Sequence, residues 1–163
     1  MNGIALTLRA LHHGERRFAR ELTTMAERHR ADHEVHHVAC DLAGWSLDHV
    51  RRLVDAGRAY GEILGDAPES AWPGPPPSNS GTAAMTSEQP PAPSLLLLHD
   101  LRALHLYATE ISLYWEMLAQ VAHAVKVEEL LTLASKCHPQ TLRQMRWTNT
   151  LIKDMSPQIL TSL

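Results

Sequence analysis

Near the middle of the chain, residues 65–93 read GDAPESAWPGPPPSNSGTAAMTSEQPPAP. This stretch holds eight of the ten prolines, and Gly, Ser and Ala fill much of the rest, so no helical or strand period survives in it. A Pro-rich chain is extended and covers about 3 Å per residue, so the stretch can span a helix of about 40 Å. We therefore expect residues 65–93 to be a flexible crossover between two halves of similar size.

In the first half, apolar residues recur at alternating steps of four and three, which is typical of one face of a helix. The two runs are Ile4, Leu8, Leu11, Glu15, Phe18, Leu22, Met25 and His29, then Val35, Val38, Leu42, Trp45, His49, Leu53, Ala56, Tyr60 and Ile63. Asp32 lies between them and is a good N-cap, because its carboxylate can accept free amide hydrogens. Residues 4–64 are predicted to form an antiparallel helical hairpin.

The same spacing resumes after Pro93 and Ser94. The runs are Leu97, Leu101, Leu104, Ala108, Ile111, Trp115, Leu118, Ala122 and Val125, then Val127, Leu131, Ala134, His138, Leu142, Met145 and Ile152. Pro139 is expected to kink the last run or to start a second helix there. Residues 94–155 are predicted to form a second hairpin, followed by a C-terminal tail over 156–163.

The fold class that these segments indicate is all-α, because no stretch of strand length alternates apolar and polar residues. Two tight hairpins joined by one long crossover describe an antiparallel four-helix bundle with ferritin-like connectivity, in a single domain over residues 1–163.

Composition excludes several classes of protein. The formal net charge of −3 argues against a nucleic-acid partner, and the longest apolar run, Leu95–Leu98, is too short for a membrane span. Two cysteines and an N-terminus without a basic, apolar leader favour the cytoplasm. Eleven histidines raise the prospect of metal or proton chemistry.

Each helix carries one ionisable residue within an apolar stripe: Glu15, His49, Glu110 and His138. Glu15 lies 17 residues before Asp32 and His49 lies 17 after it, so both are expected at one height in the first hairpin. Two carboxylates and two imidazoles would suit a mononuclear Fe, Mn or Zn site. The alternative is that Glu–His hydrogen bonds merely satisfy polar groups left in the core.

In these residues the chain resembles the ferritin-like di-iron carboxylate superfamily, and within it small bacterial stress-associated ferritin-like proteins. In that superfamily two helices each give a Glu and two each give a Glu-x-x-His. Glu15 and Glu110 match the single glutamates, and His49 and His138 match the histidines. Ser46 and Ser135 stand where the remaining glutamates would be, so two of the bridging carboxylates are missing.

Two functions follow from this resemblance. The first is a helical-bundle protein that acts by binding or assembly, with an incomplete di-iron ligand set. The alternative is a metal-dependent Fe or Mn oxidase, or an enzyme of oxidative-stress protection, that uses the Glu/His site in the core.

Apolar residues outside the main stripes bear on partners. Trp147 and Leu151 form a second stripe with Gln140 and Gln144, and the C-terminal Ile159, Leu160 and Leu163 have no obvious burial site. Exposed apolar groups of this kind often mark an interface, which favours a homodimer. The alternative is that the crossover or the tail folds over Trp147. Among the other histidines, His33 and His37 are one helical turn apart and form a weaker candidate metal site.

Overall fold

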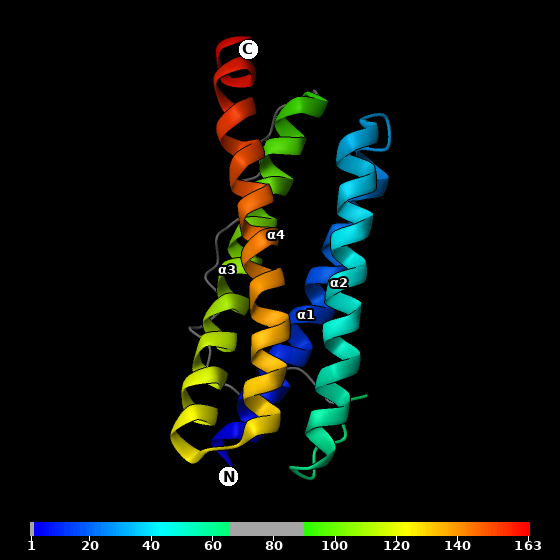
Figure 1. Ribbon diagram of the computed structural model, residues 1–163. Coiled ribbons are helices and arrows are strands. Elements are labelled where there is room, and N and C mark those ends of the chain that lie inside the picture. The colour runs from blue at the N-terminus through cyan, green and yellow to red at the C-terminus, as the bar shows by residue number, and fades with distance from the viewer. Residues whose placement is uncertain (1, 66–89) are drawn as a thin grey trace.

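The computed structural model describes residues 2–65 and 90–163, and these contain four helices and no strand. The helices are α1 (Gly3–Arg28), α2 (His33–Arg58), α3 (Pro93–Val125) and α4 (Glu128–Thr161). In Figure 1, α1 rises from the end marked N, α2 and α3 both descend, and α4 rises to the end marked C. The prediction of an all-α four-helix bundle is confirmed. Most of the predicted crossover, residues 66–89, lies outside the described residues.

The turns within the two hairpins are short and have clear local causes. Asp32 caps α2 as predicted, because its side chain accepts a hydrogen bond from the Val35 amide at 3.1 Å. Between α3 and α4, Lys126 adopts a left-handed conformation with φ 57°, and the Val127 amide donates to the Ala122 carbonyl at 3.0 Å. This pattern closes the end of α3 and turns the chain directly into α4.

Two predicted boundaries are wrong. Of the two effects predicted for Pro139, the start of a second helix is not found, because α4 continues through Pro157 to Thr161; most of the expected tail is therefore helical. A proline frees the carbonyl four residues earlier, and both Pro139 and Ser135 are exposed, so water can satisfy the Ser135 carbonyl. At the other boundary, α2 ends at Arg58 and leaves Ile63 outside the predicted stripe and 89% exposed.

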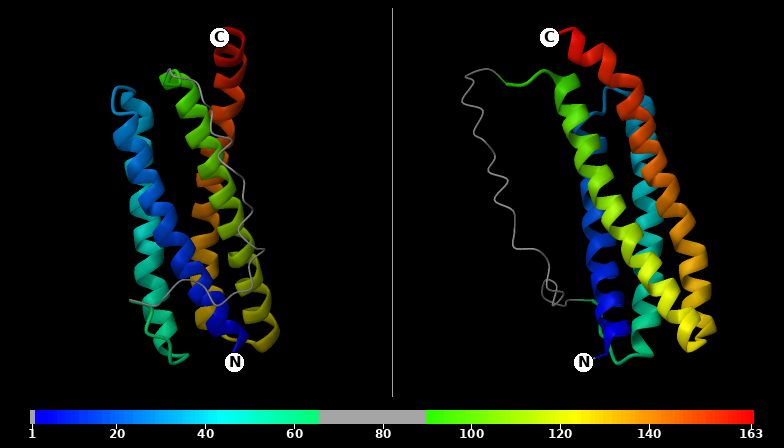
Figure 2. Two further views of the ribbon diagram at one scale, coloured as in Figure 1. Left: turned by 180° about the vertical axis from the view of Figure 1, so that it is seen from behind. Right: turned by 90° about the vertical axis from the view of Figure 1, so that its left-hand side faces the viewer.

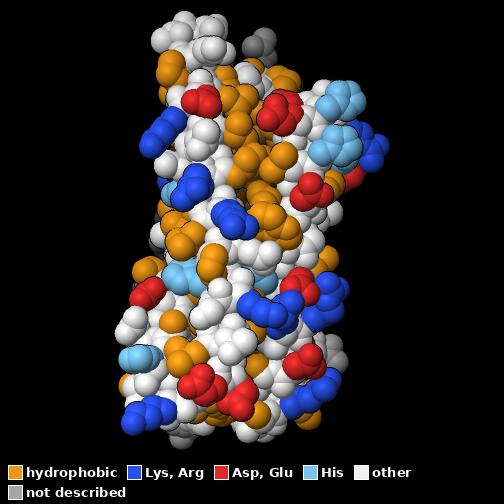
Figure 3. Space-filling model, viewed as in Figure 1, with side chains coloured by type: hydrophobic (Ala, Val, Ile, Leu, Met, Phe, Trp, Pro, Cys, Tyr) orange, Lys and Arg blue, Asp and Glu red, His pale blue; other side chains and the backbone are white. Residues whose placement is uncertain are grey.

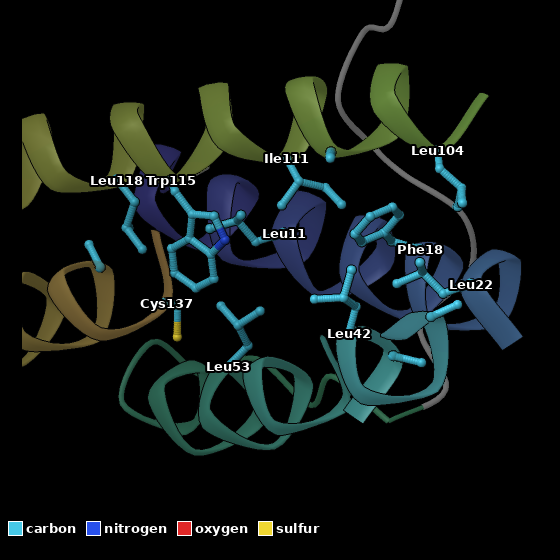
Figure 4. Packing of buried hydrophobic residues seen from close by; sticks show 14 of the residues in the cluster. Leu11, Phe18, Leu22, Leu42, Leu53, Leu104, Ile111, Trp115, Leu118 and Cys137 are labelled. Carbon is cyan, nitrogen blue, oxygen red and sulfur yellow. The ribbon is translucent and has the colours of Figure 1, made fainter. Parts of the chain in front are cut away.

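The core is built mainly from the predicted stripes of α1 and α3. Phe18 and Leu22 of α1 and Leu118 of α3 are fully buried, and Trp115 reaches between the helices toward α2 and α4 (Figure 4). For α4 the predicted stripe is wrong, since Leu142 is 45% exposed and His138 is half-buried. The buried face of α4 consists of Leu130, Leu133, Ala134, Cys137, Thr141, Gln144 and Thr148.

The four helices do not pack equally closely. α1 packs on α2 and on α3, and α4 packs on α3, whereas α2 and α4 make the sparsest contact between neighbouring helices. The left view in Figure 2 shows the hairpin of α1 and α2 beside the hairpin of α3 and α4. Within the described ranges, no helix combines the length and the apolar character that a membrane crossing requires.

Candidate functional site

The centre of the bundle contains a buried polar pair, Glu15 of α1 and His49 of α2. Both side chains have no exposed surface, and the His49 Nδ1–H group donates to Glu15 Oε1 at 2.8 Å. The predicted meeting of these two residues at one height is therefore confirmed. Trp115 of α3 adds a second donor, because its indole Nε1–H lies 3.0 Å from the same Glu15 oxygen.

The surroundings of His49 favour its charged form. Its second nitrogen, Nε2, faces the Gln140 Oε1 atom of α4 at 2.7 Å, so both ring nitrogens have an oxygen acceptor. Burial alone would lower the pKa of His49, but the hydrogen bond and the negative charge of Glu15 outweigh it and raise that pKa above its ordinary value. The two oxygen acceptors and the raised pKa both favour an imidazolium at His49.

A second buried link joins α4 to α2 one turn away. The Gln144 side-chain amide donates to the Leu42 carbonyl and to the Ser46 hydroxyl, both at 3.0 Å. Ser46 and Gln144 have no exposed surface. We call Glu15, Ser46, His49, Gln140 and Gln144 the buried polar cluster. Two of its atoms, Glu15 Oε2 and Gln144 Oε1, are buried without a hydrogen-bond partner.

The other two predicted metal ligands lie elsewhere. Glu110 is exposed and lines a shallow pocket between α1 and α3, together with His13, Arg17 and Tyr114. Burial and the charge of Glu110 raise the pKa of Tyr114. His138 is directed to α3, where its Nε2 atom and the Ser112 hydroxyl are 2.9 Å apart. The structure thus brings Glu15 and His49 together but places Glu110 and His138 outside their surroundings.

The donors around Glu15 do not fit a di-iron centre. Such a centre needs several bridging carboxylates, and the cluster supplies one carboxylate, one imidazole with both nitrogens in hydrogen bonds, two amides and a hydroxyl. Over residues 2–65 and 90–163, no group of three or more His, Cys, Asp or Glu side chains is placed to hold a metal ion. Cys137 lies on the buried face of α4, and burial, followed by the charge of Glu15, raises its pKa to about 12.

The histidines at the tip of the first hairpin are also separated. His29 is buried and pairs with Asp100 of α3 at 2.7 Å, and Arg28 reaches the other oxygen of Asp100 at 2.6 Å. His36 hydrogen-bonds the Ala26 carbonyl at 2.8 Å. His33 and His37 remain exposed. At this end of the bundle, the contacts of Arg28 and His29 with Asp100 therefore hold α1 against α3.

An apolar furrow opens between α2 and α4 beyond the buried polar cluster. Gln140, Gln144, Trp147 and Leu151 share one stripe of α4, and the first two bind α2, so Trp147 and Leu151 also face α2. On α2, the stripe that carries Leu42 and His49 also carries Val38 and Trp45. We define the furrow by Val38, Trp45, Trp147, Leu151 and Met155, all half-buried against the core.

Figure 3 shows this face of the molecule, with hydrophobic side chains gathered between α2 and α4 in the half nearest the α1–α2 turn. The predicted apolar surface of Trp147 and Leu151 is therefore half-buried on the side that faces α2, and it does not stand alone on an outer face.

Sequence reasoning missed the roles of Gln140, Gln144 and Trp115 in the buried polar cluster. The sequence signal for Gln140 and Gln144 is that they share a stripe of α4 with Trp147 and Leu151. The periodicity predicts a buried Trp115, and a buried indole N–H needs an acceptor, but spacing alone does not identify Glu15 as that acceptor.

Comparisons with known proteins found no match. No protein-family model matches the chain, no curated protein matches it, and no solved structure matches it.

Proposed function

We propose that this chain is an antiparallel, ferritin-like helical-bundle protein that acts by binding or assembly, with an incomplete di-iron ligand set. The connectivity supports the first part of the proposal. α2 ends and α3 begins at opposite ends of the bundle (Figure 2). One long crossover between two tight hairpins is the ferritin-like connection.

The observation that carries the binding function is the contrast in access between the cluster and the furrow. Glu15, Ser46, His49 and Gln144 have no exposed surface, so no substrate can reach them in this conformation. The furrow instead presents Trp45, Trp147 and Leu151, which are each only half-buried. An open apolar strip with aromatic residues is typical of an interaction surface.

The test uses the purified full chain and two readouts: self-association by sedimentation, and binding of a fluorescent amphipathic Leu/Lys peptide by anisotropy. We expect at least one of the two, and we expect Val38→Ser combined with Leu151→Ser to abolish it while the helical circular dichroism signal persists. Leu113→Ser is the matched control, since Leu113 is 61% exposed on α3 outside the furrow. Absence of both readouts in the unmodified chain would overturn the proposal.

The alternative function, a metal-dependent Fe or Mn oxidase or stress-protection enzyme, has one observation in its favour. Glu15 Oε2 is buried without a partner beside an imidazole, so Glu15 and His49 would be the residues to hold a metal. Elemental analysis of protein purified without chelators tests this function. Near-stoichiometric iron, manganese or zinc that is lost in His49→Ala would favour it, and metal-free protein whose thermal stability ignores added metal would remove it.

A further inference from the structure

We infer that the furrow is covered by a second copy of this chain, with the α2–α4 faces of the two copies packed together about a two-fold axis parallel to the bundle. This inference rests on the proposed binding function and names the partner of the same surface. In that arrangement α2 of one copy lies over α4 of the other. Three properties of the α2–α4 face support this arrangement: the opposite charge of its two edges, the levels of the charged residues along the bundle, and the area of the face.

The two edges of the furrow carry opposite charge. On α2, Glu34 and Asp41 share the stripe of Val38 and Trp45, and both acids are exposed. On α4, Arg143 is one turn from Trp147, and Arg146 is next to it. In the half nearest the α1–α2 turn, Figure 3 shows acidic side chains along the α2 edge and mostly basic ones along the α4 edge.

The edge charges are available for a partner. None of Glu34, Asp41, Arg143 and Arg146 makes an ion pair with any residue in the described parts of the chain. Asp154, further along α4, is the acidic exception on the basic edge. Two copies face to face can therefore match acid to base in the middle of the face.

The heights of these charges fit only one of the two simple arrangements. The Gln144 amide donates to the Leu42 carbonyl and the Ser46 hydroxyl, so Arg143 and Asp41 lie within about one helical turn of each other along the bundle. A two-fold axis parallel to the helices keeps the level and exchanges the edges, so Asp41 of each copy meets Arg143 of the other. An axis across the helices would instead place α2 on α2 and acid on acid.

The whole α2–α4 face, of which the furrow is the half nearest the α1–α2 turn, is large enough for a stable dimer. α2 has 26 residues and is about 39 Å long, and two neighbouring helices are about 20 Å wide. The product is about 800 Å² for each copy, which is the usual size of a specific interface. Its centre would bury Trp45 and Trp147, the residue type that most often dominates binding energy.

Charge reversal at one position on each edge gives a direct test. We expect Asp41→Arg alone and Arg143→Glu alone each to weaken self-association by about tenfold or more, because each dimer contains the altered contact twice. A mixture of the two variants should form a one-to-one heterodimer, since both contacts then pair Arg with an acid. Sedimentation equilibrium or native mass spectrometry measures all three samples. Arg20→Glu, an exposed reversal on α1 outside the furrow, should leave the dimer unchanged.

Three results would overturn this inference. They are a chain that stays monomeric at every concentration, a dimer that ignores both reversals, and a pair of weakened variants whose mixture does not recover. A monomeric chain that still binds the amphipathic peptide, and loses that binding with Val38→Ser and Leu151→Ser, would overturn the dimer but keep the proposed function. A chain without either property would overturn both.

Discussion

The buried polar cluster and the furrow are neighbours along the same two helices, yet they invert the usual relation between polarity and exposure. Where the shared stripe of α4 is polar, at Gln140 and Gln144, hydrogen bonds draw α4 onto α2 and seal Glu15 and His49 from water. Where the stripe becomes apolar, at Trp147 and Leu151, the side chains remain half-exposed. Directional hydrogen bonds hold the α2–α4 contact at the cluster, and the apolar part of the stripe stays half-exposed.

The largest expected loss of stability comes from a substitution in the buried polar cluster. Glu15→Leu leaves a buried imidazole without its carboxylate, and we expect it to lower the free energy of unfolding by about 3–5 kcal/mol. Replacing both Glu15 and His49 by Leu should cost clearly less than the sum of the two single changes, because no uncompensated charge remains. Urea unfolding followed by circular dichroism gives all three values. Additive losses would show that the pair is not coupled.

A smaller effect is expected from Trp115→Phe. The change keeps most of the aromatic volume but removes the indole hydrogen that Glu15 accepts. Loss of one hydrogen bond to a buried charged group should cost about 2 kcal/mol. The same change in a Glu15→Leu background should cost less, since the acceptor is already absent. Equal costs in the two backgrounds would assign the effect to packing alone.

The pH dependence of stability tests the contribution of His49 to the buried polar cluster. Because the pKa of His49 is raised in the folded protein, its stabilisation is fully present below the unfolded value of about 6.5 and is lost as the pH rises through the folded pKa. One proton gives a slope of at most about 1.4 kcal/mol per pH unit. Unfolding free energies measured from pH 6 to 9 should fall, and a His49→Gln chain should lose this part of the slope. An unchanged slope would contradict the paired imidazolium.

The smallest expected loss of stability comes from a substitution in the furrow. Leu151 is only half-buried, so Leu151→Ser should lower the unfolding free energy of the isolated monomer by about 1 kcal/mol or less. Measurement at low protein concentration separates this cost from any effect on association. A loss as large as that of Glu15→Leu would mean that the furrow is part of the monomer's core.

Periodicity and turn chemistry were enough to predict most of the fold. The stripes of α1 and α3, the cap at Asp32 and the meeting of Glu15 with His49 follow from spacing alone. The face of α4 did not, because its buried residues Thr141, Gln144 and Thr148 are polar and the apolar period follows a neighbouring stripe.

The error on α4 carried over to the candidate site. Rotation of that helix places Gln140 beside His49 and turns His138 to Ser112. Glu110 is predicted as a metal ligand, but it lines the pocket between α1 and α3 and is exposed. A single sequence shows which residues share a stripe, but which of two neighbouring stripes faces inward depends on the other three helices.

The shortness of the two hairpin turns has a consequence for how the chain folds. α1 packs on α2 and α3 packs on α4 more extensively than the two hairpins pack on each other, so most contacts join residues that are close in sequence. Chains with such local topology fold rapidly, because little loop entropy is lost before contacts form. Each hairpin is therefore a natural folding unit, and residues 1–65 and 90–163 produced as separate polypeptides are expected to reassemble along α1 and α3.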